Sequence, residues 1–431
     1  MKYSVFSLKN NSTIDYLLVF MLVFAFPLLP FLNSAKIAIF LIFLRLYFAG
    51  DTRRKVMKTI SSKRFLIYIL IVVFFSSYTL FLTLLKEEYD LSLLKKQFSS
   101  VVYTILTIIF FVTISKKNRK VDSLIFFAFF LQSIFIILAI VSPEFYELTT
   151  PFRKKIEDHH FEAYGRLRGA AISGYQFFGI STMYGIFILY CIIENKIKGS
   201  KKLFAFLLII ITGLISGRFT IVAILLGFFV KFIFNSTLKK QIKMLIKFSF
   251  IFILLSLTLY YSYENYLDEN TKNRINFYLV SPVEGYFNSG ELSTTSTDTV
   301  LNMYESFNLE NILTGDGRYE QEFGDGYYGK VDVGYLRMLY YYGVFGLLTL
   351  FGIQYLLITR LLKLPKDKIF FSKVLFVYFI ILNLKGDVFF YSNNTIPLII
   401  GLVYYTSNKN TLKNDNDLIG FWSNEYYKKI Y

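Results

Sequence analysis

The chain has very little of the chemistry on which metal and thiol sites depend. It holds one cysteine, Cys191, and two histidines, His159 and His160. A single cysteine inside an apolar run excludes a disulfide framework and a thiolate metal site. The adjacent histidines lack the spacing of a zinc-binding helix. No Walker A sequence and no G-x-S-x-G motif occurs, so ATP-driven transport by this chain and serine-hydrolase chemistry are not expected. We therefore expect no metal and no cofactor.

Long apolar runs dominate what is present. The chain is 55% hydrophobic and 19% aromatic, and about 20 apolar residues suffice to span the hydrocarbon core of a bilayer. We predict an all-α polytopic membrane protein with about twelve transmembrane helices. The first run lacks a small-residue cleavage site and is interpreted as a retained span, not a signal peptide. The predicted spans are residues 14–32, 35–49, 65–85, 98–115, 121–141, 169–193, 203–215, 219–234, 248–262, 334–358, 369–384 and 395–406.

The distribution of basic residues predicts the orientation. With a cytoplasmic N-terminus, the predicted inside segments hold 28 of the 47 lysines and arginines, and the outside segments hold 22 of the 30 acids. Basic residues near span ends are retained in the cytoplasm, so both termini are predicted to be cytoplasmic. The net charge of +17 is thus explained by topology, and we expect no nucleic-acid partner.

One long polar interruption sets the domain organisation. Residues 263–333 contain no run able to span a bilayer and carry thirteen acids against four bases. We predict a single transmembrane helical domain, residues 1–408, with extracytoplasmic loops 142–168 and 263–333. Residues 409–431 form a predicted cytoplasmic tail. A large acidic loop flanked by arginines indicates a site that works outside the cytoplasm.

Arginines at predicted outer span ends are the first candidate site residues. Arg166 and Arg168 precede the sixth span, and Arg218 follows Ser216 and Gly217 in a turn with almost no loop. Guanidinium groups bind phosphate with bidentate geometry, and a charge held near the membrane is costly. The alternative is that these side chains snorkel to lipid headgroups.

The end of the large loop supplies the second group. Gly315 and Gly317 permit a tight turn or a close backbone approach to a ligand, and Arg318 follows them. Asp332 stands where the chain re-enters the membrane, where a carboxylate can orient or deprotonate a sugar hydroxyl; the alternative is an acid near a helix N-cap. Arg337 follows within the next span.

Two further patterns have less specific interpretations. Gly343 and Gly346 favour close helix packing. Lys385, at the outer end of the eleventh span, pairs either with Asp387 or with acids of the large loop.

In these motifs and their order the chain resembles the O-antigen polymerase (Wzy-like) family, which shares its layout with the O-antigen ligases. The residues that carry the resemblance are Arg166-Leu-Arg168-Gly169, Ser216-Gly217-Arg218, Gly315-Asp316-Gly317 and Asp332-Val-Gly334-Tyr335, followed by Gly343 and Gly346. An arginine followed eleven positions later by glycine is described for the long outer loops of some members. Arg168 with Gly179 and Arg318 with Gly329 fit that spacing.

The resemblance implies a metal-independent glycosyltransferase of the bacterial plasma (inner) membrane. It would move a growing glycan from undecaprenyl pyrophosphate to the non-reducing end of a lipid-linked repeat unit, for O-antigen, capsule or exopolysaccharide. Expected partners are the undecaprenyl-pyrophosphate-linked oligosaccharide, membrane lipid, a chain-length regulator and a flippase.

Electrostatics suggests roles for the candidate residues, because arginines can hold the anionic pyrophosphate leaving group. Our hypothesis assigns catalysis to Arg218, Arg318 and Asp332, with Arg168 in the same arginine cluster. It assigns substrate binding to the remaining candidates, which are Arg166, Arg168, Arg337, Gly315 and Gly317.

Two other functions stay open at this point. A ligase transfers finished glycan to an acceptor, and ligases of the related type usually carry a histidine in the large loop, where this chain has none. A flippase for lipid-linked oligosaccharide would not need so large an outer loop. Loss of a polymerase leaves single repeat units on the final acceptor, loss of a ligase leaves lipid-linked polymer, and loss of a flippase traps units on the cytoplasmic leaflet.

Overall fold

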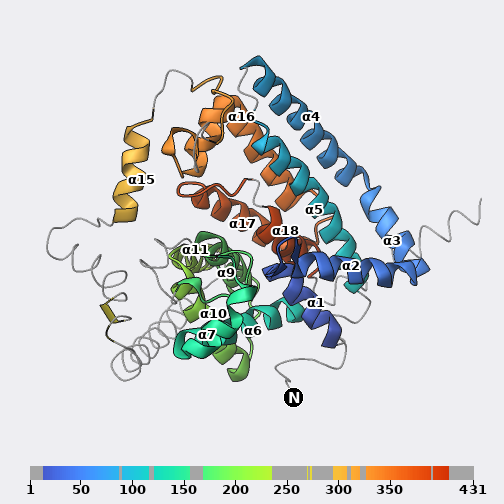
Figure 1. Ribbon diagram of the computed structural model, residues 1–431. Coiled ribbons are helices and arrows are strands. Elements are labelled where there is room, and N and C mark those ends of the chain that lie inside the picture. Colours follow the sequence, from blue (N-terminus) through green and yellow to red (C-terminus); the bar gives the residue numbers. More distant parts are fainter. Residues whose placement is uncertain are drawn as a thin grey trace, which may run out of the picture.

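The computed structural model describes residues 13–86, 90–115, 121–155, 168–234, 269, 272–273, 295–307, 312–320, 327–389 and 392–406. These residues are mostly helical (Figure 1), which confirms the predicted helical class, and they include one small two-stranded hairpin. The helices before residue 160 are α1 (Thr13–Phe24), α2 (Ser34–Tyr47), α3 (Gly50–Ile60), α4 (Lys63–Leu85), α5 (Ser92–Ile114), α6 (Val121–Val141), α7 (Pro143–Thr149) and η2 (Thr150–Phe152). Those that follow are α9 (Phe178–Ile193), α10 (Ser200–Ser216), α11 (Phe219–Phe234), α15 (Thr295–Glu305), η4 (Tyr328–Lys330), α16 (Gly334–Thr359), η5 (Lys366–Lys368), α17 (Ile369–Leu382), α18 (Ser392–Ile399) and the π-helical turn η6 (Ile400–Tyr404).

Uninterrupted apolar runs form helices close to the predicted bounds. Helices α6 and α11 coincide with the predicted residues 121–141 and 219–234. The prediction for residues 14–32 is wrong in its second half, because α1 ends at Phe24 and the strands β1 (Pro27–Leu29) and β2 (Leu32–Asn33) form an antiparallel hairpin. Pro27 and Pro30 explain the difference, since proline lacks the amide hydrogen that a helix interior requires.

Four of the described helices are long and apolar enough to cross a membrane: α4, α5, α6 and α16. Shorter apolar helices cover Thr13–Phe24, Phe178–Ile193, Phe219–Phe234 and Thr395–Tyr404. This is the character of a membrane protein. The layout with twelve crossings stays a prediction; its ninth span, residues 248–262, and the tail, residues 409–431, lie outside the described residues.

Helix α9 lies at the centre of the bundle. Every residue from Ile180 to Ile193 is buried, and α9 packs against α10, α11, α17 and α18. On its α6 side the rings of Phe129 and Phe187 stack with centroids 4.4 Å apart. Helix α4, in contrast, exposes one apolar face with Leu70 and Phe74 on it, as expected of a face that contacts lipid.

Contacts at the helix termini define two ends of the bundle. At the first end, the ring of Phe178 at the start of α9 lies against Gly386, just after α17. At the second end, Glu194 after α9 forms an ion pair with Lys368 before α17. Helices α9 and α17 are therefore antiparallel, and the two ends of the bundle carry different loops.

Candidate functional site at the first end of the bundle

The segments that carry most of the candidate residues meet at the first end of the bundle. The edge-to-face rings of Phe178 and Phe219, 5.0 Å apart, join the starts of α9 and α11. The amide of Tyr335 donates to the carbonyl of Asn383 at 3.2 Å, which joins the start of α16 to the end of α17. Residues far apart in sequence thus lie beside one another because four helices begin or end there.

Three cationic side chains gather in this region: Arg168, Arg218 and Lys385. The pKa of Lys385 lies below its usual value, first because burial disfavours the charged form and then because Arg218 and Arg168 repel it. Asp332 acts in the opposite direction and stabilises the ammonium. The fold therefore holds like charges close together next to one carboxylate, an arrangement that suits an anionic ligand.

The backbone around Arg168 and Arg218 is shaped by close packing. Helix α10 ends at Ser216 and α11 begins at Phe219, so the turn before Arg218 is as tight as predicted. A Cβ on Gly217 would lie 2.8 Å from the Ser181 hydroxyl and 3.6 Å from Nη2 of Arg168. Glycine at this position lets the turn lie directly against α9 and the Arg168 guanidinium.

Arg168 lies before α9, because the helix begins at Phe178 and not at residue 169. Its guanidinium carbon is 6.0 Å from the centroid of the Phe177 ring. Phe177 has φ of 49°, a left-handed conformation that is costly for a side chain of this size, by about 1–3 kcal/mol. Strain of this kind is found at binding and catalytic sites, where surrounding contacts enforce it.

Arg337 sits in a buried hydrogen-bonded network next to this cluster. It is 3% exposed, and its Nε donates to the carbonyl of Val331 at 3.0 Å. Its Nη1 donates to the Tyr319 hydroxyl at 3.1 Å, and its Nη2 pairs with Asp332 at 2.8 Å. The Tyr319 hydroxyl in turn donates to Asp387 at 2.7 Å. Arg337 is therefore a buried brace between loop and helices, whereas the Asp332 side chain is 72% exposed.

The α4–α5 connection also holds Tyr319. A carboxylate oxygen of Asp90 accepts hydrogen bonds from the amides of Tyr319 and Glu320, at 2.7 and 2.9 Å. Near the start of α5, Nζ of Lys96 lies 3.9 Å from the centroid of the Tyr319 ring. The segment after Arg318 is therefore held both by residues at the start of α5 and by Arg337 near the start of α16.

Gly315 and Gly343 allow the loop to cross α16 at very close range. Gly315 has φ of 70° and Gly343 has φ of 66°, the latter in a kink of α16. A Cβ on Gly315 would lie 2.5 Å from the carbonyl oxygen of Tyr341, and one on Gly343 would clash with the carbonyl of Leu313. The close backbone approach predicted at Gly315 is thus made to α16; its role in ligand binding stays a prediction.

Gly317 and Arg318 lie near the end of α4. Gly317, with φ of 75°, lies against Lys86 at the end of that helix. The guanidinium carbon of Arg318 is 5.9 Å from the centroid of the Tyr328 ring. Arg318 therefore lies near Tyr328. Arg168 and Arg218 instead interact electrostatically with Lys385. Arg166 lies outside the described residues.

Sequence reasoning missed three participants: Tyr319, Asp90 and Lys96. Tyr319 directly follows Arg318, but tyrosine is too common in this chain to single it out, since 34 are present. Lys385 is predicted to pair with Asp387 or with an acid of the large loop. Asp332, at the end of that loop, stabilises its ammonium, and Asp387 accepts a hydrogen bond from Tyr319.

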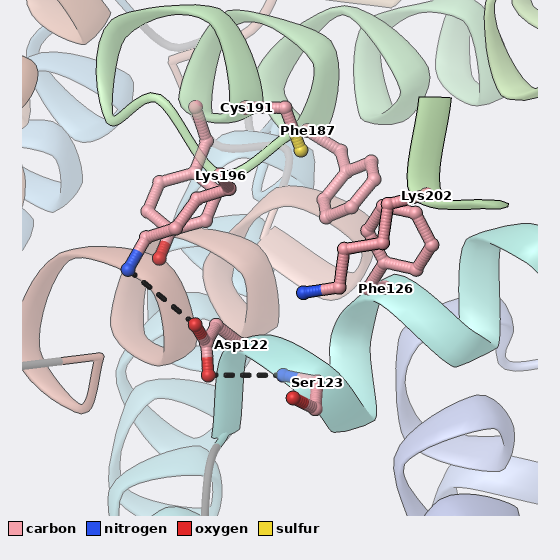
Figure 2. A pocket seen from close by; sticks show the side chains of 8 residues that line it. Asp122, Ser123, Phe126, Phe187, Cys191, Lys196 and Lys202 are labelled. Carbon is pink, nitrogen blue, oxygen red and sulfur yellow. Dashed lines mark hydrogen bonds and ion pairs between the residues drawn. The ribbon is translucent and has the colours of Figure 1, made fainter. Parts of the chain in front are cut away.

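A separate small pocket opens at the second end of the bundle (Figure 2). Asp122 at the start of α6 forms an ion pair with Lys196 at 3.4 Å. Lys202 lies over the Phe126 ring, with Nζ 5.9 Å from the centroid. The length of α9, about 24 Å at 1.5 Å per residue, separates this pocket from the cationic cluster. Among the residues that the structure describes, no group of three or more His, Cys, Asp or Glu side chains could hold a metal ion.

No protein-family model, curated protein or solved structure matches this chain.

Proposed function

We propose that this chain is a polysaccharide repeat-unit polymerase. It would transfer a growing glycan from undecaprenyl pyrophosphate to the non-reducing end of a lipid-linked repeat unit on the outer face of the bacterial plasma membrane. The observation that supports this proposal best is the gathering of Arg168, Arg218 and Lys385 beside Asp332 at one end of a helical bundle. Cations held together by a fold, close to apolar helices, suit a diphosphate on a lipid carrier.

The chemistry assigns a role to each group. Breaking the glycosidic bond places additional negative charge on the pyrophosphate, and cations positioned beforehand stabilise that charge. Arg168, Arg218 and Lys385 would bind the pyrophosphate of the donor. The exposed carboxylate of Asp332 would accept a hydrogen bond or the proton from the acceptor hydroxyl. Arg337, buried beneath the exposed carboxylate, would orient Asp332 through the 2.8 Å ion pair.

The proposed membrane layout places this site outside the cell. It has twelve crossings and cytoplasmic termini, so residues 168, 218, 332 and 385 would face the periplasmic or external side. The basic residues near Lys196 and Lys368, at the second end of the bundle, would then face the cytoplasm, in agreement with the positive-inside rule.

The test is elongation of a purified lipid-linked repeat unit by the isolated protein. Arg218→Ala and Arg168→Ala, made separately, should each lower the elongation rate by about 100-fold or more, the scale for removal of one charge-stabilising donor. Arg360→Ala is the matched control, because Arg360 is an exposed arginine at the opposite end of α16, and it should elongate normally. Normal polymer length with well-expressed Arg218→Ala would remove Arg218 from the mechanism, and absence of elongation by the intact protein would refute the polymerase.

A further inference from the structure

The most basic exposed helix of the described chain is α3, and it stands apart from the proposed active site. Its eleven residues include Arg53, Arg54, Lys55 and Lys58, all with exposed side chains. Lys63 and Arg64 follow at the start of α4 and are exposed as well. Only one acid, Asp51, lies among them. The result is a dense positive patch on α3 and the start of α4.

The position of α3 relative to a bilayer follows from its neighbour. Two residues separate the end of α3 from the start of α4, which is long and apolar enough to span a membrane and exposes an apolar face. The start of α4 must therefore lie at a membrane surface, and α3 is joined to it there (Figure 1). A contact of Arg64 places the start of α4 at the second end of the bundle. Its Nη1 donates to the carbonyl of Leu362, just after α16, at 3.3 Å.

The surroundings of α3 combine charge with exposed aromatic rings. Val56 is its one buried side chain and faces the bundle, where α3 packs on α5. Tyr47 and Phe48, at the end of α2, are 71% and 83% exposed, and Met57 on α3 is also exposed. Aromatic side chains next to lysines and arginines are characteristic of the region where lipid headgroups meet the hydrocarbon.

We propose that α3, with Lys63 and Arg64, is a binding site for the headgroups of anionic phospholipids. A cluster of four to eight basic residues next to a transmembrane helix attracts anionic lipid by about 1 kcal/mol per residue, or roughly fivefold in affinity each. The aromatic pair Tyr47 and Phe48 would anchor the patch in the headgroup layer, and Val56 would hold it to the bundle. This site is independent of the glycan chemistry proposed above.

The experiment measures lipid retained by the full-length protein. Purified protein in detergent is titrated with phosphatidylglycerol or phosphatidylcholine, and bound lipid is counted by native mass spectrometry. We expect selective retention of phosphatidylglycerol, and a roughly 25-fold weaker retention in the double variant Arg54→Gln/Lys55→Gln. The matched control is Lys154→Gln/Lys155→Gln, which removes two adjacent exposed basic residues elsewhere and should retain phosphatidylglycerol like the wild type.

A second measurement needs no variant. Raising the salt concentration from about 0.05 to 0.5 M shortens the screening length to a few ångströms, so retention of phosphatidylglycerol by the wild-type protein should fall. Equal retention of both lipids, an equal loss in the two double variants, or retention that salt does not change would each overturn the proposal.

Discussion

At the scale of single residues, the strongest determinant of the site is the buried arginine of α16. Arg337 donates to Val331, Tyr319 and Asp332, and Tyr319 passes the connection on to Asp387. A buried charge is costly unless its partners are complete. The exposed carboxylate of Asp332 therefore owes its position to a network that is itself hidden from solvent.

We expect Arg337→Ala to destabilise the protein by about 3–5 kcal/mol, because it leaves the buried Asp387 without the guanidinium charge close to it. Tyr319→Phe should cost less, about 1–3 kcal/mol, because it removes hydrogen bonds and no charge. Thermal unfolding followed by size-exclusion chromatography in detergent measures both. A Tyr319→Phe protein less stable than Arg337→Ala would contradict this ranking.

A second residue-scale prediction concerns the loop crossing over α16. Gly315→Ala and Gly343→Ala should each cost about 1–3 kcal/mol or more, because both positions have positive φ and no space for a Cβ. Gly352→Ala in the same helix is the control, since nothing lies within 4 Å of its added Cβ. That variant should be neutral or more stable by up to about 1 kcal/mol. Equal melting temperatures for Gly343→Ala and Gly352→Ala would refute the explanation.

At the scale of elements, the α4–α5 connection anchors the loop that follows residue 312. Burial, the largest single influence, raises the pKa of Asp90. The hydrogen bonds that its carboxylate accepts from Ser92, Glu320 and Tyr319 together lower that pKa below its ordinary value. The ionised form is thus favoured in the folded protein. One carboxylate holds two elements that are more than 200 residues apart in sequence.

The sign of the pH dependence follows from this lowered pKa. Asp90 contributes stability above its unfolded pKa of about 4, and the contribution is lost as the pH falls through the lower folded value. The melting temperature of the wild type should exceed that of Asp90→Asn at pH 6, and the difference should shrink below about pH 4. Melting curves from pH 3 to 7 test this, and a difference that grows toward acid would show that the sign is wrong.

At the scale of the whole molecule, the open question is which end of the bundle faces outward. The cationic cluster and the loop lie at the first end, and α3 and Lys368 lie at the second. The positive-inside rule predicts that the basic second end faces the cytoplasm. The proposed activity requires this orientation, because a polymerase must meet glycan that has already crossed the membrane.

Cysteine labelling in intact cells reads out this orientation. Cys191, the single cysteine of the chain, is buried and can be replaced by alanine to give a silent background. Lys330→Cys, at an exposed position beside the site, should react with a membrane-impermeant maleimide, and Met57→Cys on α3 should react only after permeabilisation. Labelling of Met57→Cys alone in intact cells would put the site in the cytosol and end the proposed function.

Much of the helical architecture follows from the amino-acid sequence by itself. Apolar runs without proline determined the bounds of α6 and α11, because a segment surrounded by lipid or by other helices must satisfy its own backbone hydrogen bonds. The same reasoning located the tight turn before Arg218. It failed at residues 27–33, where two prolines divide an apolar run and a hairpin forms instead.

Which of the candidate residues are neighbours depends on how the helices pack, and no single segment of the sequence shows it. Arg168 and Arg218 come together with Lys385, and Arg318 instead lies beside Tyr328, because side-chain position depends on where α9, α11, α16 and α17 end relative to one another. The hydrogen bond between Tyr319 and Asp387 joins residues 68 positions apart. No local pattern records such a contact, since it depends on the packing of helices that the sequence specifies one by one.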